Sequence, residues 1–160
     1  MMKEAIEDFR RTVEEASARL LSISEEESES ARASGKWSAK EIIGHLIDSA
    51  SNNHQRFVRA QFTDDLLFLG YEQDAWVSVQ QYRRESWHLL VQLWKSFNLH
   101  LAHVMEQTPP SVLEKPRVEH SLDRIAWKIV SKDEPVTLEY LMQDYIEHLK
   151  NHLRQVFKEG

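Results

Sequence analysis

The sequence predicts an all-α protein, a four-helix bundle with long crossover connections. Four long segments repeat apolar residues at spacings of three and four, the pattern of a helix with one buried face. Only four glycines and four prolines interrupt 160 residues, which favours a few long helices over many short strands. A chain of this length suits one domain, and we expect that domain to span residues 1–160.

The first two helices have clear signals. Residues 3–23 form an apolar stripe, which consists of Ile6, Phe9, Val13, Ala16 and Leu20. The polar stretch "SISEEESESARASGKW" that follows is typical of a surface connection. The second helix begins at Ser38, because "SAKE" is a capping box in which Ser38 and Glu41 each satisfy a free backbone amide. We expect it to continue to about residue 60.

The third and fourth helices flank a long connection. The third is predicted from near Val79 to Gln107, where Pro109 and Pro110 end it. The fourth begins at the cap Thr137 and runs close to the C-terminus. Residues 108–136 are too many for a structureless link in a compact domain, so we expect them to fold over the bundle and shape a cleft. Within them, "RIAWKIV" suits a short strand or a packed extended segment.

Composition excludes several classes of protein. A net charge of −6 argues against nucleic-acid binding, which needs a concentrated basic face. No apolar run is long enough to cross a membrane, and the acid-rich start resembles neither a secretion signal nor a transit peptide. We therefore expect a cytoplasmic protein. The chain has no cysteine, so any thiol chemistry needs a thiol brought by a cosubstrate.

The segment "YIEHLKNHLRQV" places His148 and His152 four residues apart on the predicted last helix. Residues at this spacing lie one above the other, so both imidazoles can reach one metal ion. With eight histidines in the chain, however, such a pair also arises easily by chance. The pair sits at the edge of the buried arc of its helix, which suits a cleft between helices. A third ligand has to come from elsewhere.

A polar line on the second helix offers that ligand. His45, Asp48, Ser49, Asn52 and Arg56 fall close to one line at about 100° per residue. The line contains neither lysine nor glutamate, the usual cover of an exposed helix face. It fits a solvent-facing stripe or the wall of a polar pocket, and the composition favours the pocket. His45 is then the best third ligand.

The remaining five histidines are weaker candidates. His54 lies on the opposite side of the second helix, where we expect it to be hydrogen-bonded and packed against apolar neighbours. His88, His100 and His103 lie off the main apolar stripe of the third helix, and His120 lies in the long connection.

The stretches "GKWSAKEIIGHLIDSASNNHQRF", "YEQDAWVSVQQYRRESWHLLVQLW" and "VTLEYLMQDYIEHLKNHLRQVF" together resemble the DinB/YfiT-like family of metal-dependent enzymes. The resemblance implies a bundle in up-down-down-up order, and dimers are common in the family. It also implies a divalent ion, often zinc or nickel, held by three histidines that fall on His45, His148 and His152. Some members transfer low-molecular-weight thiols such as bacillithiol to electrophiles, and mycothiol-dependent members isomerise maleylpyruvate.

Three functions follow as alternatives. The leading hypothesis is an enzyme that transfers a low-molecular-weight thiol to an electrophilic small molecule. The others are a metal-dependent hydrolase that uses activated water, and a non-catalytic bundle that binds a ligand. We expect a homodimer that binds no nucleic acid and no membrane.

Four further residues are candidates near the metal. Asp48 and Asp144 lie one turn from His45 and His148, and either orients an imidazole, shuttles a proton or is a plain surface carboxylate. Asn52 and Arg56 are candidates to hold polar or anionic parts of a substrate farther along the cleft.

Overall fold

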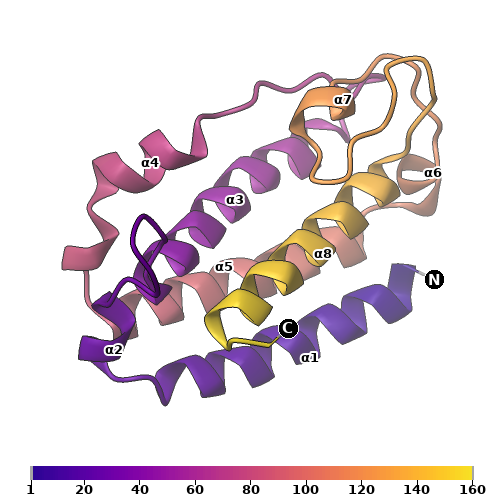
Figure 1. Ribbon diagram of the computed structural model, residues 1–160. Coiled ribbons are helices and arrows are strands. Elements are labelled where there is room, and N and C mark those ends of the chain that lie inside the picture. Colours follow the sequence, from indigo (N-terminus) through magenta and orange to yellow (C-terminus); the bar gives the residue numbers. More distant parts are fainter. Residues whose placement is uncertain (1, 160) are drawn as a thin grey trace.

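Four long helices make up most of the protein in a computed structural model that describes residues 2–159 (Figure 1). They are α1 (Met2–Leu21), α3 (Ala39–Arg59), α5 (Trp87–Gln107) and α8 (Leu138–Val156). Short helical segments lie in the connections: α2 (Glu25–Glu29), α4 (Gln73–Gln80), the 3₁₀ turn η1 (Tyr82–Arg84), α6 (Pro110–Leu113) and α7 (Leu122–Ile125). Within residues 2–159 extended segments pair only as isolated bridges. The predicted all-α four-helix fold is confirmed.

Contacts between the long helices fix their directions. Trp87 Nε1 at the start of α5 donates to the carbonyl of Leu20 near the end of α1 at 2.8 Å, and Glu106 near the end of α5 forms an ion pair with Arg10 in the first half of α1. These two helices are therefore antiparallel. Gln61, just beyond α3, donates to the hydroxyl of Thr108, just beyond α5, at 3.3 Å, so α3 and α5 end together. Figure 1 shows α8 running in the same direction as α1 and against α3. The α3–α8 pair is therefore antiparallel.

Two of the predicted helix starts are confirmed by their caps. Ser38 N–H donates to Glu41 Oε1 at 3.0 Å, and Glu41 N–H donates to Ser38 Oγ at 3.3 Å, which completes the capping box of α3. Thr137 Oγ1 accepts from the N–H of Tyr140 at 3.1 Å and caps α8. Both caps satisfy amides that a helix start leaves free.

The predicted start of the third helix near Val79 is wrong. Val79 belongs to α4, and α5 begins eight residues later at Trp87, with Ser86 as its cap. Gln81, between them, has φ 53° and ψ 46°, a left-handed conformation that ends α4. Residues 80–86, "QQYRRES", contain no apolar residue except Tyr82, so no buried helical face continues through them.

Gly44 lets the chain after α4 pack tightly on α3. A Cβ atom at Gly44 would lie 2.2 Å from Cδ2 of Tyr82, a distance that no packed pair of carbons tolerates. The ring of Tyr82 therefore lies directly on the α3 backbone, and its hydroxyl reaches Asp48 at 2.6 Å. The contact holds η1, and with it α4, against one side of α3.

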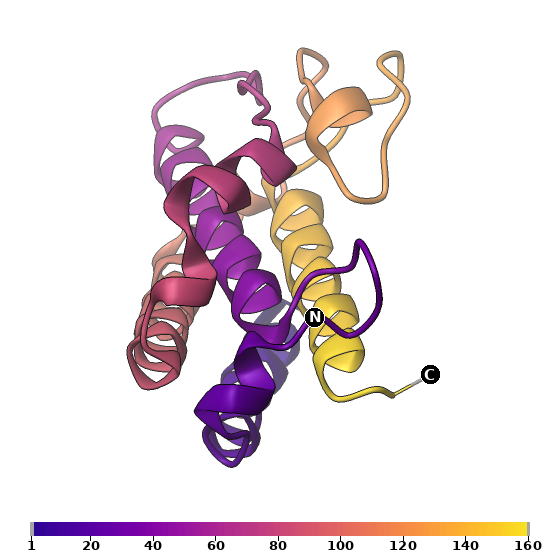
Figure 2. The same cartoon turned by 60° about the vertical axis from the view of Figure 1, so that its left-hand side comes forward.

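The 108–136 connection covers the end of the bundle where α3 ends and α8 begins (Figure 2). The buried His120 holds it together, since Nδ1 accepts from the N–H of Leu122 at 3.1 Å and Nε2 donates to the carbonyl of Glu134 at 2.8 Å. The prediction for "RIAWKIV", a short strand or a packed extended segment, is wrong. The segment forms the end of α7 and then an irregular stretch that bends at Trp127 and Lys128, and Val130 N–H donates back to the carbonyl of Leu122 at 3.4 Å. None of the helices within residues 2–159 is long and apolar enough to span a bilayer.

Candidate metal centre

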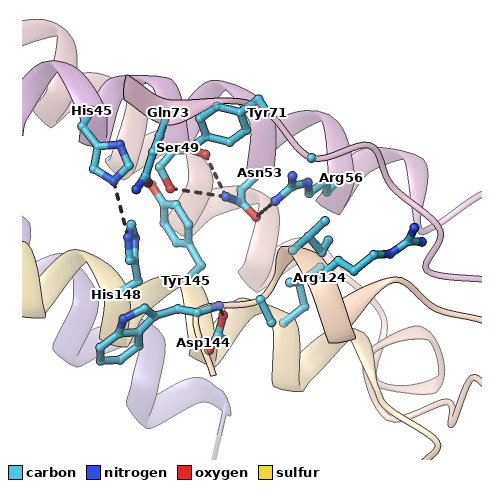
Figure 3. Close-up of a pocket in the computed structure, with 15 residues that line it drawn as sticks. His45, Ser49, Asn53, Arg56, Tyr71, Gln73, Arg124, Asp144, Tyr145 and His148 are labelled. Atoms are coloured by element: carbon cyan, nitrogen blue, oxygen red, sulfur yellow. Dashed lines mark hydrogen bonds between the residues drawn. The ribbon is translucent and has the colours of Figure 1, made fainter. Parts of the chain in front are cut away.

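Three imidazoles from two helices converge on one point. His45 comes from α3, and His148 and His152 come from successive turns of α8. Nε2 of His148 lies 3.5 Å from Nε2 of His45 and 3.1 Å from Nε2 of His152. One nitrogen from each of the three rings lies within 4.8 Å of the other two. Figure 3 shows the rings of His45 and His148 pointing toward each other across the gap between the helices.

This spacing fits a metal ion. Nitrogens bound to one ion at about 2.1 Å with tetrahedral angles are about 3.4 Å apart. The two observed Nε2 separations, 3.1 and 3.5 Å, bracket that value. A set of three imidazole donors suits zinc, nickel, copper or iron, and it leaves coordination positions open, as catalytic sites do.

The charge state of the three rings also fits. Burial, followed by the neighbouring imidazoles of His152 and His148, lowers the pKa of His45 to about 3. Burial and then His152 lower the pKa of His148 to about 4. Burial lowers the pKa of His152 as well. All three rings are therefore neutral near pH 7, the form that has a lone pair for a metal.

Neighbouring side chains fix two of the rings. The ring of Trp37 lies 5.0 Å from that of His45, centroid to centroid, and covers it. His45 itself is 1% exposed. Nδ1 of His152 lies 2.9 Å from Gln155 Oε1, which accepts its proton and leaves Nε2 free to bind. Both contacts orient the imidazole toward the shared centre.

A cavity of about 320 Å³ starts at His45 and His148 and extends between α3 and α8 (Figure 3). Its size lies within the range of small-molecule sites. Its wall comes from α3, α8, the segment between α3 and α5, and the 108–136 connection. Besides the two histidines, the lining residues are Ser49, Asn53, Arg56, Gly70, Tyr71, Gln73, Arg124, Ile125, Ala126, Trp127, Leu141, Asp144 and Tyr145. The expected cleft beneath the 108–136 connection is therefore present.

The polar face of α3 is rotated from its predicted position. Ser49, Asn53 and Arg56 line the cavity together with His45, at helical positions i, i+4, i+8 and i+11. Asn52 does not line it, and its side chain donates to the carbonyl of Asp48 within the same helix at 2.9 Å. The sequence prediction placed Asp48 (i+3) and Asn52 (i+7) on the same face as His45, and it missed Asn53. The stripe of i+4 steps from His45 is the signal that identifies Asn53.

Asp48 is buried beside the site but faces away from the cavity. Its Oδ1 accepts from Tyr82 at 2.6 Å and from Gln80 at 2.8 Å, and its Oδ2 has no partner within residues 2–159. Burial raises the pKa of Asp48, although both hydrogen bonds oppose that shift. Nδ1 of His45 is likewise buried without a partner in the same range. The carboxyl group thus anchors the segment after α4, and no hydrogen bond joins it to His45.

Asp144 lines the cavity, but both of its oxygens are engaged. The backbone N–H groups of Trp127 and Lys128 donate to Oδ2 and Oδ1, each at 2.8 Å. Burial raises the pKa of Asp144, and these two amides lower it in part. The carboxylate therefore ties the chain after α7 to α8 and holds one wall of the cavity in place.

Replacement of Asp144 by asparagine is expected to loosen that wall. The amide keeps one acceptor and turns an NH₂ group toward a backbone N–H, which costs about 1–3 kcal/mol for the unpaired group. We expect faster hydrogen exchange at the amides of Trp127 and Lys128, measured by NMR. The exposed carboxylate of Asp133 in the same connection provides the matched control, Asp133→Asn, which should leave exchange unchanged. Equal protection in both variants would show that the carboxylate does not hold this segment.

The other five histidines lie outside the cluster. His54 is half-buried on the far side of α3, where its ring meets those of Phe97 and His100 at centroid distances of 5.7 and 5.2 Å. His88, His100 and His103 are exposed on α5. His120 is committed to the connection that it holds together. Within residues 2–159, the three ring nitrogens at the cavity form the only group that suits a metal.

Comparisons with known proteins agree with the fold. YfiT from Bacillus subtilis, described as a probable metal-dependent hydrolase with an unusual four-helix bundle topology, superposes with a TM-score of 0.75. The match covers 98% of this chain and 86% of YfiT at 16% sequence identity, so it shows a shared fold. No curated protein matches the sequence. The sequence profile of the DinB superfamily matches residues 8–156, and the chain therefore belongs to the DinB superfamily.

Proposed function

We propose that this protein is a metal-dependent hydrolase that cleaves an ester or amide bond in a small molecule. His45, His148 and His152 would hold the divalent ion, zinc or nickel. The observation that carries the proposal is the convergence of three neutral imidazoles at one end of a cavity large enough for a small molecule. The shared fold with YfiT, itself described as a probable metal-dependent hydrolase, supports it.

The chemistry divides between the ion and the chain. A divalent ion bound by three imidazoles supplies a Lewis acid that activates water and polarises a carbonyl group. In hydrolysis the water oxygen adds to the carbonyl carbon, the bond to the alcohol or amine breaks, and a proton from water ends on the leaving group. Ser49 and Tyr71 bring neutral hydroxyl groups to the cavity wall, where they can orient the substrate. Asp48 and Asp144 would act by positioning, because each already serves other groups.

Thiol transfer is the second candidate, and a second hollow favours it. A cavity of about 360 Å³ lies beside Trp37 and Gln155, the residues that contact His45 and His152. Arg32, Lys36 and one acidic residue, Asp74, also line it, and the two cations suit the carboxylates of a low-molecular-weight thiol. In this reaction the thiolate sulfur bonds to an electrophilic carbon, a leaving group departs with the bonding electrons, and the thiol proton goes to solvent.

The thiol requirement separates these functions. Protein purified without a histidine tag and loaded with zinc or nickel would be assayed with 4-nitrophenyl esters, and with 1-chloro-2,4-dinitrobenzene in the presence and absence of bacillithiol. Ester cleavage without thiol supports hydrolysis, whereas turnover only with thiol supports transfer. Activity that persists at the wild-type rate in His148→Ala, which removes a ligand, overturns both.

A further inference from the structure

Arg56 is a buried cation on the wall of the cavity (Figure 3). It comes from the α3 stripe that starts at His45, and the residue is 6% exposed. Its Nη1 donates to Asn53 Oδ1 at 3.4 Å and its Nη2 to the carbonyl of Leu69 at 3.0 Å. No carboxylate of residues 2–159 forms an ion pair with it. Two neutral acceptors therefore serve a guanidinium that carries five N–H donors.

Such burial is costly unless an anion compensates for it. The other buried arginine, Arg117, lies in the field of Asp64 and Asp65, both of which favour its charged form. At Arg56 the desolvation is opposed only by Tyr71, a phenol that is neutral at pH 7 at its ordinary pKa of about 10, which burial raises further. Arg56 thus lacks the acidic neighbours that accompany Arg117.

The rest of the cavity offers no anion for Arg56. Asp144 is the one carboxylate among the described lining residues, and two backbone amides occupy its oxygens. Arg124 also reaches the wall, but it is exposed and its Nε lies 3.9 Å from Oδ1 of Asp123. Arg56 is therefore the one arginine or lysine among the described lining residues that has no carboxylate within ion-pair distance. An anionic ligand in the cavity would supply the counter-charge that Arg56 lacks.

We propose that Arg56 binds a carboxylate group of the substrate, at the end of the cavity away from the three histidines. The planar edge of a guanidinium matches the two oxygens of a carboxylate, and a single buried arginine balances its single charge. The statement that the bound molecule is also cleaved at the histidines rests on the proposed function. The carboxylate-binding site at Arg56 does not depend on that function.

The α3 helix sets the length of such a molecule. Eleven residues separate His45 from Arg56, a rise of about 16 Å along the helix axis. The head of Arg56 turns back toward Asn53, three residues earlier, which shortens the gap to roughly 10–15 Å. The substrate class is therefore an elongated ester or amide with a carboxylate at the far end from the scissile bond, such as the hemiester of a medium-chain dicarboxylic acid.

Binding to the metal-free protein tests Arg56 separately from the metal. Octanoate and octanamide have the same length and differ in charge, and calorimetry compares their affinities. We expect octanoate to bind more tightly to the wild type and Arg56→Met to lose that preference, by about tenfold or more, as charge-assisted hydrogen bonds imply. Arg59→Met removes an exposed arginine from the same helix and should keep the preference for octanoate over octanamide. Arg56→Lys, which keeps the charge without the planar edge, should show a smaller loss and serves if the methionine variant does not fold.

The metal-loaded protein then tests the substrate class. The 4-nitrophenyl hemiester of suberic acid should have a lower KM than 4-nitrophenyl octanoate. Arg56→Met should abolish this difference in KM, whereas Arg59→Met should keep it. If the metal-free variant retains the wild-type preference for octanoate, or phenylphosphonate binds more tightly than octanoate, the carboxylate site is overturned. If that preference depends on Arg56 but neither ester is hydrolysed, the carboxylate site stands and the hydrolase proposal fails.

Discussion

His148→Ala is expected to abolish stoichiometric binding of zinc or nickel. His148 lies between the other two candidate ligands, with its Nε2 3.5 Å from that of His45 and 3.1 Å from that of His152. Without the His148 imidazole, only the nitrogens of His45 and His152 remain to bind the ion. We expect the affinity for the metal to fall by more than about 100-fold. Removing a residue that only hydrogen-bonds to a ligand already lowers metal affinity by up to about 100-fold, and removing the ligand itself should cost more. Calorimetric titration and elemental analysis of untagged protein measure the change.

An exposed histidine provides the control for that experiment. His100→Ala removes an imidazole from the surface of α5, away from the cavity, and should bind one ion per chain with wild-type affinity. Circular dichroism should show equal helix content in both variants, because neither imidazole supports a helix cap or the apolar core. Wild-type metal content in His148→Ala would contradict the three-histidine site.

The metal-free protein is expected to lose stability as the pH falls from about 6.5 to about 4. Unfolded histidines bind protons below a pKa of about 6.5, whereas His45 and His148 in the folded state remain neutral until about 3 and about 4. The unfolded state therefore binds more protons in this window, so the free energy of unfolding rises with pH. Each histidine contributes up to about 1.4 kcal/mol per pH unit, so a drop of about 2–4 kcal/mol is expected between pH 6.5 and 5.

Urea unfolding of the metal-free protein at several pH values measures this slope. The raised pKa values of Asp48 and Asp144 act in the opposite sense at the acidic end, so the informative quantity is the difference between variants. His148→Gln removes one proton acceptor of the unfolded state and should flatten the slope by up to about 1.4 kcal/mol per pH unit. Identical slopes for this variant and the wild type would show that the imidazole is not held neutral by the fold.

Local sequence signals predicted the parts of the fold that depend on local chemistry. The capping box at Ser38 and the cap at Thr137 placed the starts of α3 and α8, because a cap involves only neighbouring residues. The spacing of four placed His148 and His152 on one face in the same way. The end of α4 at Gln81 was missed, because glutamine has no special preference for the left-handed conformation that ends the helix. It becomes necessary only when Tyr82 has to reach Gly44.

The site required tertiary information at two points. The exact direction of the polar face of α3 depends on where α8 lies, so Asn52 was taken for a cavity residue and Asn53 was missed. The role of Asp144 depends on backbone amides from a connection whose path the sequence does not reveal. A carboxylate near a metal ligand can orient the ligand, transfer a proton or hold a neighbouring segment in place. Only its hydrogen-bond partners distinguish these roles.

Anomalous diffraction from a crystal grown with zinc tests the central claim most directly. One strong anomalous peak is expected between α3 and α8, with Nε2 of His45, His148 and His152 each about 2.1 Å from the ion. A peak bound by the two α8 histidines alone, with the His45 ring turned away, would contradict the three-histidine centre.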